Sequence, residues 1–296
     1  MHKHDLAPIV LFVYNRPWHT EQTLNSLRKN PLAKESVLYV FADGPKENAT
    51  PEDRLKIIET RAVLRKKDWC KEIIIIEGDI NKGLATSVIK GVTEIVNKHG
   101  KIVVLEDDLV LAPTFLEFMN DGLNLYQDKQ NIYSINGYMF PFYYKEEKTV
   151  LLPYTSTWGW ATWSSKWKAF RNDMQDKNML ETNPFLASKF NLANYRYTDM
   201  LNYGNNSWGI KWYFAIFIRN GLNVFPSKSL VSNIGFDGSG ENCVVEEIEG
   251  KLQIASGVRV SDESEIDLKF YNAFINFFSK KRNSKSKLAH FFNYFK

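Results

Sequence analysis

Cysteine is scarce in this sequence, and the sequence contains no long apolar run. The 296 residues include two cysteines, Cys70 and Cys243, which lie far apart and form no Cys-x-x-Cys pair. That spacing argues against a disulfide framework or a cysteine metal cluster and favours a reducing compartment. No apolar stretch reaches the ~18 residues of a transmembrane helix, and the N-terminal residues lack the apolar core of a signal peptide. We therefore expect a cytoplasmic protein.

Charge of one sign is not in large excess either. The 38 basic and 34 acidic residues give a formal net charge of +4, which provides no indication of nucleic-acid binding. The five histidines are scattered, and each is more typical of a surface residue than of a metal ligand. Hydrophobic residues make up 44% of the chain and aromatic residues 14%, which indicates a globular protein with a sizeable core.

Strand-like and helix-like segments alternate through the first half of the chain. Apolar runs at residues 8–14, 37–41 and 73–76, and the run that ends at Glu106, are typical of buried strands. Helix-like segments follow the first three of these runs. The alternation predicts an α/β fold in which helices flank a mostly parallel sheet.

The second and third predicted helices have recognisable apolar faces. The second begins with Thr50 as its cap, and its expected apolar face is Leu55, Ile58 and Ala62. The third ends near Gly100, and its expected apolar face is Leu84, Val88, Val92 and Ile95. Each helix should pack that face against the rest of the protein.

Three consecutive acids, Glu106, Asp107 and Asp108, follow the fourth predicted strand. Ligands of open α/β sheets bind at the carboxyl ends of such strands. Neighbouring carboxylates repel one another and lose hydration unless a cation or a polar ligand meets them. Their oxygens are hard ligands that suit Mg²⁺ or Mn²⁺. The acids therefore predict a site for a divalent ion and a diphosphate, with a solvated acidic turn as the alternative.

Polar residues also follow the other predicted strands. They are Arg16 after the first, Asp43 after the second, and Asn81, Lys82 and Gly83 after the third. The ends of parallel strands share one edge of a sheet, so these residues should converge on the acids. Arginine is a natural partner of phosphate, and an aspartate can accept hydrogen bonds from a base or a ribose. Each residue alone would be an ordinary turn residue, but together they predict a nucleotide-diphosphate site.

Three of these segments resemble the GT-A glycosyltransferases. They are residues 10–16, 41–43 and 104–115, which contain an Asn-Arg pair, an Asp and a Glu-Asp-Asp run. The resemblance is closest to the N-acetylglucosaminyltransferase I family and looser to the bacterial family 2 glycosyltransferases. It covers roughly residues 8–240, and the Glu-Asp-Asp run is its most specific part.

The resemblance implies a role for each matching residue. Asp108 would bind the metal ion, Mn²⁺ or Mg²⁺, that bridges the donor diphosphate, while Glu106 and Asp107 would contact the donor sugar and the ribose. Asp43 would contact the uracil imide, and Arg16 would lie near the phosphates.

A glycine-rich segment at residues 226–240 resembles the family's loop that closes over the phosphates. Its glycines, which include Gly238, suit a mobile lid, although an ordinary surface loop is the alternative. The resemblance thus adds Gly238 to the residues that would bind the nucleotide sugar.

The reaction that the resemblance implies is inverting transfer of a sugar, N-acetylglucosamine in the expected case, from a UDP-sugar to a hydroxyl of a glycan or a lipid-linked acceptor. Such a reaction would serve the assembly of a bacterial surface polysaccharide or glycoconjugate. The family places a catalytic Asp beside a tryptophan in the segment that residues 208–212 resemble, but this chain has no acid there. Asp237 and Asp199 are the nearest substitutes for the catalytic base, and Asp237 is slightly favoured.

Tryptophans are expected to contact the acceptor. Trp158, Trp160 and Trp208 would stack on sugar rings, since the glycines beside them suggest exposure. Packing in the core is the alternative for each of them.

A basic and aromatic tail is expected at residues 256–296. Amphipathic helices of that composition lie on anionic membranes, which would suit a lipid-linked acceptor at the inner face of the cytoplasmic membrane. The alternative is a helix packed on the catalytic domain. Residues 1–255 should form that domain, with a donor half at about 1–130 and an acceptor half at about 131–255.

Two other functions fit parts of the sequence. A nucleotidyltransferase also combines an α/β sheet with acids and a divalent ion, but residues 14–18 do not match the glycine-rich basic signature that such an enzyme usually carries. The second is a catalytically silent protein that binds sugar nucleotides or glycans, which the missing base supports. A Rossmann dehydrogenase is disfavoured because no Gly-x-Gly-x-x-Gly follows the first strand.

Overall fold

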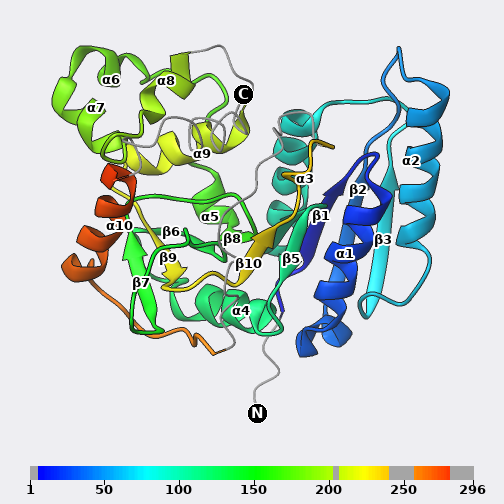
Figure 1. Cartoon of the computed structure of the whole chain (residues 1–296), viewed down its shortest axis with the longest axis horizontal. Helices are drawn as coiled ribbons and strands as arrows, with labels where there is room; N and C mark the ends of the chain where they lie inside the picture. Colours follow the sequence, from blue (N-terminus) through cyan, green and yellow to red (C-terminus); the bar gives the residue numbers. More distant parts are fainter. Residues whose placement is uncertain (1–5, 203–206, 240–256, 281–296) are drawn as a thin grey trace.

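The computed structural model describes residues 6–202, 207–239 and 257–280. Within these residues, one large sheet lies at the centre of the molecule (Figure 1). Its strands are β1 (Ile9–Val13), β2 (Val37–Ala42), β3 (Glu72–Glu77), β4 (Lys101–Glu106), β6 (Ile132–Asn136), β7 (Thr149–Leu152), β8 (Trp160–Trp163) and β9 (Leu222–Pro226). They follow the order β3-β2-β1-β4-β8-β6-β9-β7. A small second sheet pairs β5 (Leu109–Leu111) with β10 (Val231–Asn233).

Four parallel strands form the first half of the large sheet. β1 lies between β2 and β4, with Leu11 opposite both Val40 and Leu105, and β3 adds to the outer side of β2. β1 is buried along its whole length, which explains its unbroken apolar sequence. The predicted strand and helix alternation is confirmed, and with it the parallel half of an α/β fold.

The second half continues the same sheet with mixed directions. β8 runs antiparallel to β4, with Val103 opposite Ala161, and β6 runs antiparallel to β8. β9 is parallel to β6, and β7 is antiparallel to β9. One sheet therefore spans both halves of the chain, and the direction of the strands changes beside β4.

Helices cover both faces of the sheet. They are α1 (Pro17–Arg28), the short 3₁₀ helix η1 (Pro31–Glu35), α2 (Pro51–Leu64), α3 (Leu84–His99), α4 (Phe115–Leu125), α5 (Ser164–Trp167), α6 (Asn178–Thr182), α7 (Pro184–Phe190), α8 (Tyr197–Asn202), α9 (Trp208–Phe217) and α10 (Leu268–Lys280). One hydrophobic cluster joins side chains of α1, α4 and α10, and the other joins side chains of α3 and α9.

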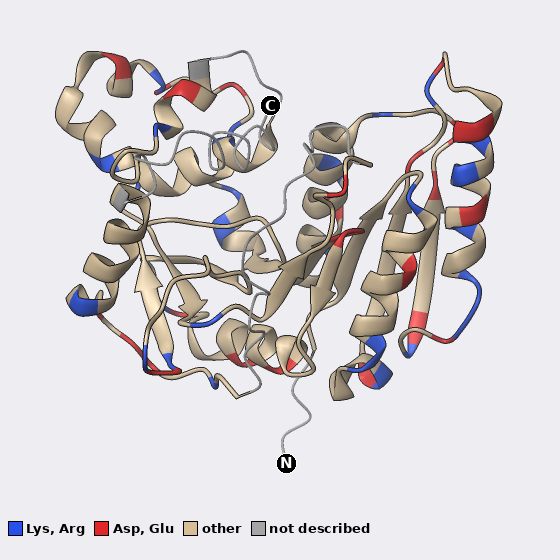
Figure 2. Ribbon diagram, viewed as in Figure 1, with Lys and Arg blue, Asp and Glu red and all other residues tan. Residues whose placement is uncertain are grey.

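The apolar face expected for α2 is wrong. Leu55 and Ile58 are 54% and 64% exposed. The face that packs inward consists of Ile57, Thr60 and Leu64. The sequence offers two faces of similar polarity, and the face with Ile57, Thr60 and Leu64 is buried in the helix that packs against α1. The helix start is as expected, because Thr50 accepts a hydrogen bond from the Asp53 amide in a capping box. Figure 2 shows acidic and basic residues interspersed along this helix.

The apolar face of α3 is confirmed in part. Val88, Val92 and Ile95 are buried, but Leu84 at the start of the helix is 44% exposed. Gly100 ends the helix in the left-handed conformation, as its position predicts.

The tail helix packs on the protein. Phe270, Phe274 and Phe278 of α10 are buried, and their rings contact Phe140 and Phe142. The expectation that this apolar face lies on a membrane is therefore wrong for residues 268–280, because protein already covers it. The basic and aromatic residues 281–296 lie outside the described part of the chain. Among the described residues, no helix is long and apolar enough to span a membrane.

Candidate functional site

The three acids lie where β4 ends, beside the carboxyl end of β1. Glu106 is the last residue of β4 and pairs in register with Phe12. Asp107 and Asp108 form the turn that leads into β5. Glu106, Asp107 and Asp108 are only 6%, 4% and 0% exposed. The alternative of a solvated acidic turn is therefore wrong, and the carboxylates need partners within the protein or from a ligand.

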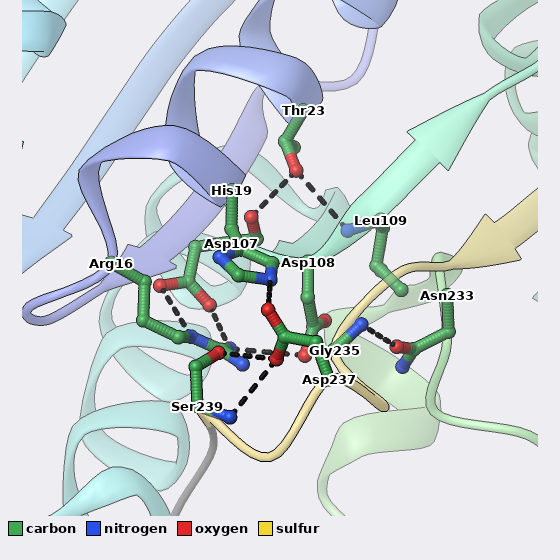
Figure 3. Close-up of polar contacts among 10 residues, drawn as sticks. All are labelled: Arg16, His19, Thr23, Asp107, Asp108, Leu109, Asn233, Gly235, Asp237 and Ser239. Atoms are coloured by element: carbon green, nitrogen blue, oxygen red, sulfur yellow. Dashed lines mark hydrogen bonds and ion pairs between the residues drawn. The ribbon is translucent and has the colours of Figure 1, made fainter. Parts of the chain in front are cut away.

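Arg16 provides the first of these partners. Its Nε donates to Asp107 Oδ2 at 3.3 Å, and its Nη2 donates to Asp108 Oδ2 at 3.0 Å and also to Asp107 Oδ1. Figure 3 shows the guanidinium held between the two carboxylates. The convergence of Arg16 with the acids, predicted from the strand order, is thus present in the structure.

One guanidinium does not offset three acids. Burial, followed by repulsion from Asp108 and Asp107, raises the pKa of Glu106 to about 8. Burial also raises the pKa of Asp107, although Arg16 opposes that effect. The cluster therefore favours a further positive charge or a bound proton.

The backbone of the acid turn is fixed by α1. Thr23 Oγ1 donates to the Asp107 carbonyl at 2.7 Å and accepts from the Leu109 amide at 3.1 Å. Both contacts are buried, so α1 sets the position of the turn from which the carboxylates project. Sequence reasoning missed Thr23, because nothing in the spacing of an interior helix residue indicates a partner 84 positions away.

The glycine-rich segment lies directly over the acids. The Ile234 amide donates to the Asp108 carbonyl at 2.8 Å, and the Gly235 amide donates to Asn233 Oδ1 at 2.7 Å. A Cβ on residue 235 would collide with the Asp108 carboxylate and crowd Arg16. Glycine is therefore required at this position by close approach.

Asp237 is tied into the same site. Its Oδ2 lies 3.1 Å from His19 Nε2, and its Oδ1 accepts from the Ser239 amide at 2.9 Å and from the Ser239 hydroxyl at 2.6 Å. Burial opposes ionisation of Asp237, but these Ser239 hydrogen bonds and then His19 outweigh it and lower the pKa. His19 is buried on α1, so the expectation of a surface histidine is wrong for it.

A cavity of about 540 Å³ adjoins the acids. Phe12 and Phe41 form its aromatic floor, and Glu106, Asp107 and Arg16 line one part of it. The rest of its wall includes Asp43, Lys46, Asn48, Thr50, Asp53, Asn81, Gly83, Leu84, Ser87 and Ser239. Asp108 is not among the lining residues, because the glycine-rich segment covers it.

Asp43 organises the start of α3. Its carboxylate accepts from the Lys82 amide at 3.0 Å and from the Gly83 amide at 3.1 Å. Asn81 donates from its side chain to the Gly44 carbonyl at 3.2 Å. Lys82 thus contributes its backbone amide here, while Asp43, Asn81 and Gly83 line the cavity.

Sequence reasoning also missed Arg61. This side chain of α2 donates to the Gly78 carbonyl at 2.6 Å and so holds the loop that follows β3. It also pairs with Glu77 at 3.3 Å. An arginine among the other charged residues of α2 carries no sequence signal of such a role.

Asp199 does not join the acids. It lies on α8 and pairs with Arg196 at 3.1 Å. Gly238 lies in the segment next to Asp237 and has a positive φ of 84°. Of the two candidate bases, the structure brings only Asp237 to the acid cluster.

The expected exposure of the tryptophans is wrong. Trp158, Trp160 and Trp208 are all at most 5% exposed. Trp160 stacks on Trp208 with ring centroids 5.6 Å apart, and Trp158 packs edge-on against Phe236 at 5.7 Å. These side chains fill the core rather than a groove for an acceptor, and Gly159, between Trp158 and Trp160, lies against the Phe115 ring instead of solvent.

The acid cluster could hold a divalent ion only if groups outside the protein, such as phosphate or water, supplied the remaining ligands. Among the described residues, no group of three or more His, Cys, Asp or Glu side chains is arranged to hold a metal. Asp107 and Asp108 nevertheless hold the cationic Arg16 between them, which shows that their oxygens face a common point. Mg²⁺ is commonly bound by one or two carboxylates together with phosphates and water.

Comparison with known proteins finds structural similarity at low sequence identity. The chain is similar to mouse xyloside xylosyltransferase 1 in its apo form, with 13% identity, coverage of 71% of this chain and 80% of that chain, and a TM-score of 0.38. It is also similar to residues 1–349 of S. aureus TarS, with 14% identity, coverage of 76% and 59%, and a TM-score of 0.37. A UDP-glucose pyrophosphorylase complexed with UDP-glucose gives 11% identity, coverage of 75% and 90%, and a TM-score of 0.36.

No protein-family model matches the chain, and no curated protein matches it at a significant level. TM-scores this low do not identify a substrate or a reaction. The geometry of the acids, Arg16 and the cavity is therefore the basis on which a function can be proposed.

Proposed function

We propose that this protein is a metal-dependent glycosyltransferase that transfers a sugar from a UDP-sugar to a hydroxyl group. One observation carries the proposal. Buried carboxylates of Asp107 and Asp108 share the cationic Arg16 at the carboxyl end of parallel strands, beside a cavity of about 540 Å³. Ligand cavities of several hundred Å³ commonly hold molecules of nucleotide size.

The donor would extend along the cavity from its aromatic floor to the acids. We assign the base to the part that contains Phe41 and Asp43, and the diphosphate to the part that contains Arg16. Arginine binds phosphate oxygens through paired hydrogen bonds. Asp43 already accepts backbone hydrogen bonds, but each carboxylate oxygen can accept more than one, so it retains capacity for a uracil imide.

Asp108, with Asp107 beside it, would hold Mn²⁺ or Mg²⁺. The ion would neutralise charge on the departing diphosphate. In this arrangement Arg16 exchanges its carboxylate partners for phosphate oxygens. Glu106 and Asp107 lie on the cavity wall, where they would contact the ribose and the donor sugar.

Asp237 is the proposed general base. Its carboxylate would remove the proton of the acceptor hydroxyl while the oxygen bonds to the anomeric carbon and the bond to UDP breaks, with inversion. His19 and Ser239 orient that carboxylate. N-acetylglucosamine as the sugar, a glycan hydroxyl as the acceptor and kinship with the N-acetylglucosaminyltransferase I family belong to the same proposal and are supported by the sequence motifs.

The test is thermal unfolding of the purified protein with a panel of nucleotide sugars, in Mn²⁺ and in EDTA. A ligand that binds only the folded state stabilises it by mass action, by about 2.7 kcal/mol at a concentration 100 times its Kd. A rise in Tm with one UDP-sugar that disappears in EDTA supports the proposal and identifies the donor. No rise with any nucleotide or nucleotide sugar contradicts it.

A further inference from the structure

Gly91 lies within α3, where the helix passes over the aromatic floor of the cavity. It is buried. Glycine in the interior of a helix is less favourable than alanine, because it loses more backbone entropy on folding. Glycine at position 91 therefore lowers the stability of the helix relative to alanine. The neighbouring side chains show what occupies the space that an alanine methyl group would need.

Two phenylalanine rings occupy the space beside Gly91. A Cβ on residue 91 would lie 2.8 Å from Phe12 Cε1, 2.9 Å from Phe12 Cζ and 3.1 Å from Phe41 Cε2. Comfortable carbon contacts lie at about 3.5–4.0 Å. A methyl group here would thus displace both ring tips.

The two rings that a methyl group would displace also form part of the cavity wall. They stack on each other with centroids 5.4 Å apart and an interplanar angle of 22°. Both rings pack in one hydrophobic cluster with Val88 and Val92 of α3 and Val104 of β4. Both rings also line the cavity. Because packed core has little spare room, a methyl group at residue 91 should shift these rings and so change the cavity wall.

We propose that Gly91 is a specificity-determining residue that sets the depth of the cavity and thereby admits the base of a nucleoside diphosphate. In this proposal Gly91 does not contact the ligand. Its lack of a side chain leaves room beside α3 for the rings of Phe12 and Phe41. The inference depends on the proposed function for the identity of the ligand. The displacement of the rings depends only on the contacts described above.

The test begins with Gly91→Ala and the binding of UDP in the presence of Mn²⁺. The variant should raise the Kd of UDP by about tenfold or more, the effect expected when a ring intrudes on a ligand. Its Tm should change about as much as that of Gly122→Ala, because each variant adds a methyl group to a helix and crowds a buried neighbour. Weaker UDP binding in Gly91→Ala alone separates this role from a purely structural one.

Two further variants sharpen the test. Phe12→Leu replaces one ring with a smaller side chain. In the Phe12→Leu background, Gly91→Ala should therefore raise the Kd of UDP much less than it does in the wild-type protein. Gly122→Ala is the matched control, because Gly122 lies within α4 and a Cβ there would be 2.9 Å from Ile135 Cγ2. Gly122 is not a cavity residue, and its variant should bind UDP as the wild-type protein does.

A crystal structure of Gly91→Ala distinguishes failure of this inference from failure of the proposed function. If wild-type protein binds UDP and the variant binds it equally well, the inference is overturned and the proposed function stands. If wild-type protein binds no nucleotide, the proposed function fails, and the crystal structure of Gly91→Ala alone tests the inference. Rings displaced into the cavity support the inference, and rings in their original positions overturn it.

Discussion

His19 Nε2 lies 3.1 Å from Asp237 Oδ2, and this contact connects α1 to the segment that covers the acids. His19 is buried, whereas the Asp237 side chain is 48% exposed. The contact thus joins a buried side chain on α1 to a half-exposed side chain on the segment. His19 therefore acts as an anchor for the glycine-rich segment.

Replacing His19 with alanine should loosen this segment, in addition to the loss of global stability that truncating a buried side chain causes. A half-exposed pair contributes at most about 1 kcal/mol, so the amides of residues 234–238 should exchange with solvent up to about fivefold faster. Hydrogen exchange measured by mass spectrometry on this peptide tests the expectation. His99→Ala, which removes a histidine bonded to Tyr39, is the control and should leave the exchange unchanged.

Asp108→Asn should remove metal-dependent binding of the donor. The substitution keeps the shape of the side chain but removes one charge, and Arg16 retains Asp107 as its partner. We expect the Kd of a UDP-sugar in Mn²⁺ to rise at least about tenfold, which corresponds to roughly 1.4 kcal/mol. Calorimetry in Mn²⁺ and in EDTA measures this, and the two proteins should not differ in EDTA. Unchanged affinity in Mn²⁺ would remove Asp108 from the metal site.

Asp237→Asn should lower turnover, whereas Asp199→Asn should not. Asp237 lies with the acid cluster, while Asp199 pairs with Arg196 on α8. A positioned general base contributes roughly 10²–10⁴-fold to the rate, so kcat should fall by that order in Asp237→Asn and stay unchanged in Asp199→Asn. Release of UDP with the donor identified by thermal unfolding provides the assay. The reverse pattern would transfer the role to Asp199.

Asp267 should stabilise the tail helix in a way that depends on pH. A hydrogen bond from Lys148 lowers the pKa of Asp267 below its ordinary value of 3.8. A lowered pKa means that the contribution is fully present above pH ~4 and is lost as the pH falls through the folded-state pKa. Asp267→Asn should lower the free energy of unfolding by about 0.5–1 kcal/mol at pH 7.

Denaturant unfolding at several pH values checks this expectation. Asparagine can still accept the Lys269 and Phe270 amide hydrogen bonds that Asp267 accepts at the start of α10, so the variant isolates the charge. The difference between the two proteins should shrink as the pH falls through the lowered folded-state pKa of Asp267, because its side chain then becomes neutral like asparagine. A difference that persists at low pH would assign the effect to the helix cap instead.

Phe274→Ala should test whether α10 belongs to the core. The ring is fully buried and packs against Phe140 and Tyr154. Removing it should lower the free energy of unfolding by about 3–5 kcal/mol. Leu268→Ala, at a position that is 69% exposed, is the control and should cost much less. Equal, small effects would show that α10 detaches in solution.

The sequence was sufficient to predict the parallel half of the sheet. Residues of β1 are apolar on both faces, a pattern that only a strand covered on both sides sustains. Strand ends in such a sheet meet at one edge, so the convergence of Arg16, Asp43 and Glu106 on one cavity followed from their positions alone.

The rest of the fold and of the site depends on contacts between side chains that the hydrophobic periodicity of the sequence does not encode. The burial of Trp160 and Trp208 is decided by the rings that stack on them, and the glycine beside Trp160 suggested the opposite. The inner face of α2 is decided by its neighbour α1 and not by its own apolar residues. His19 and Thr23 join the site through partners far along the chain, so no local pattern could identify them.

The central place of β4 has a consequence for how the protein refolds. On one side Phe12 pairs with Glu106, and on the other Val104 pairs with Trp160, so the strand that ends in the acids is held by segments distant in sequence. Closing such long loops costs entropy before any contact repays it, and sheets of this kind form on timescales of about milliseconds to seconds. Short fragments that contain the acids should therefore have no site, and the cavity should be among the last features to appear during refolding.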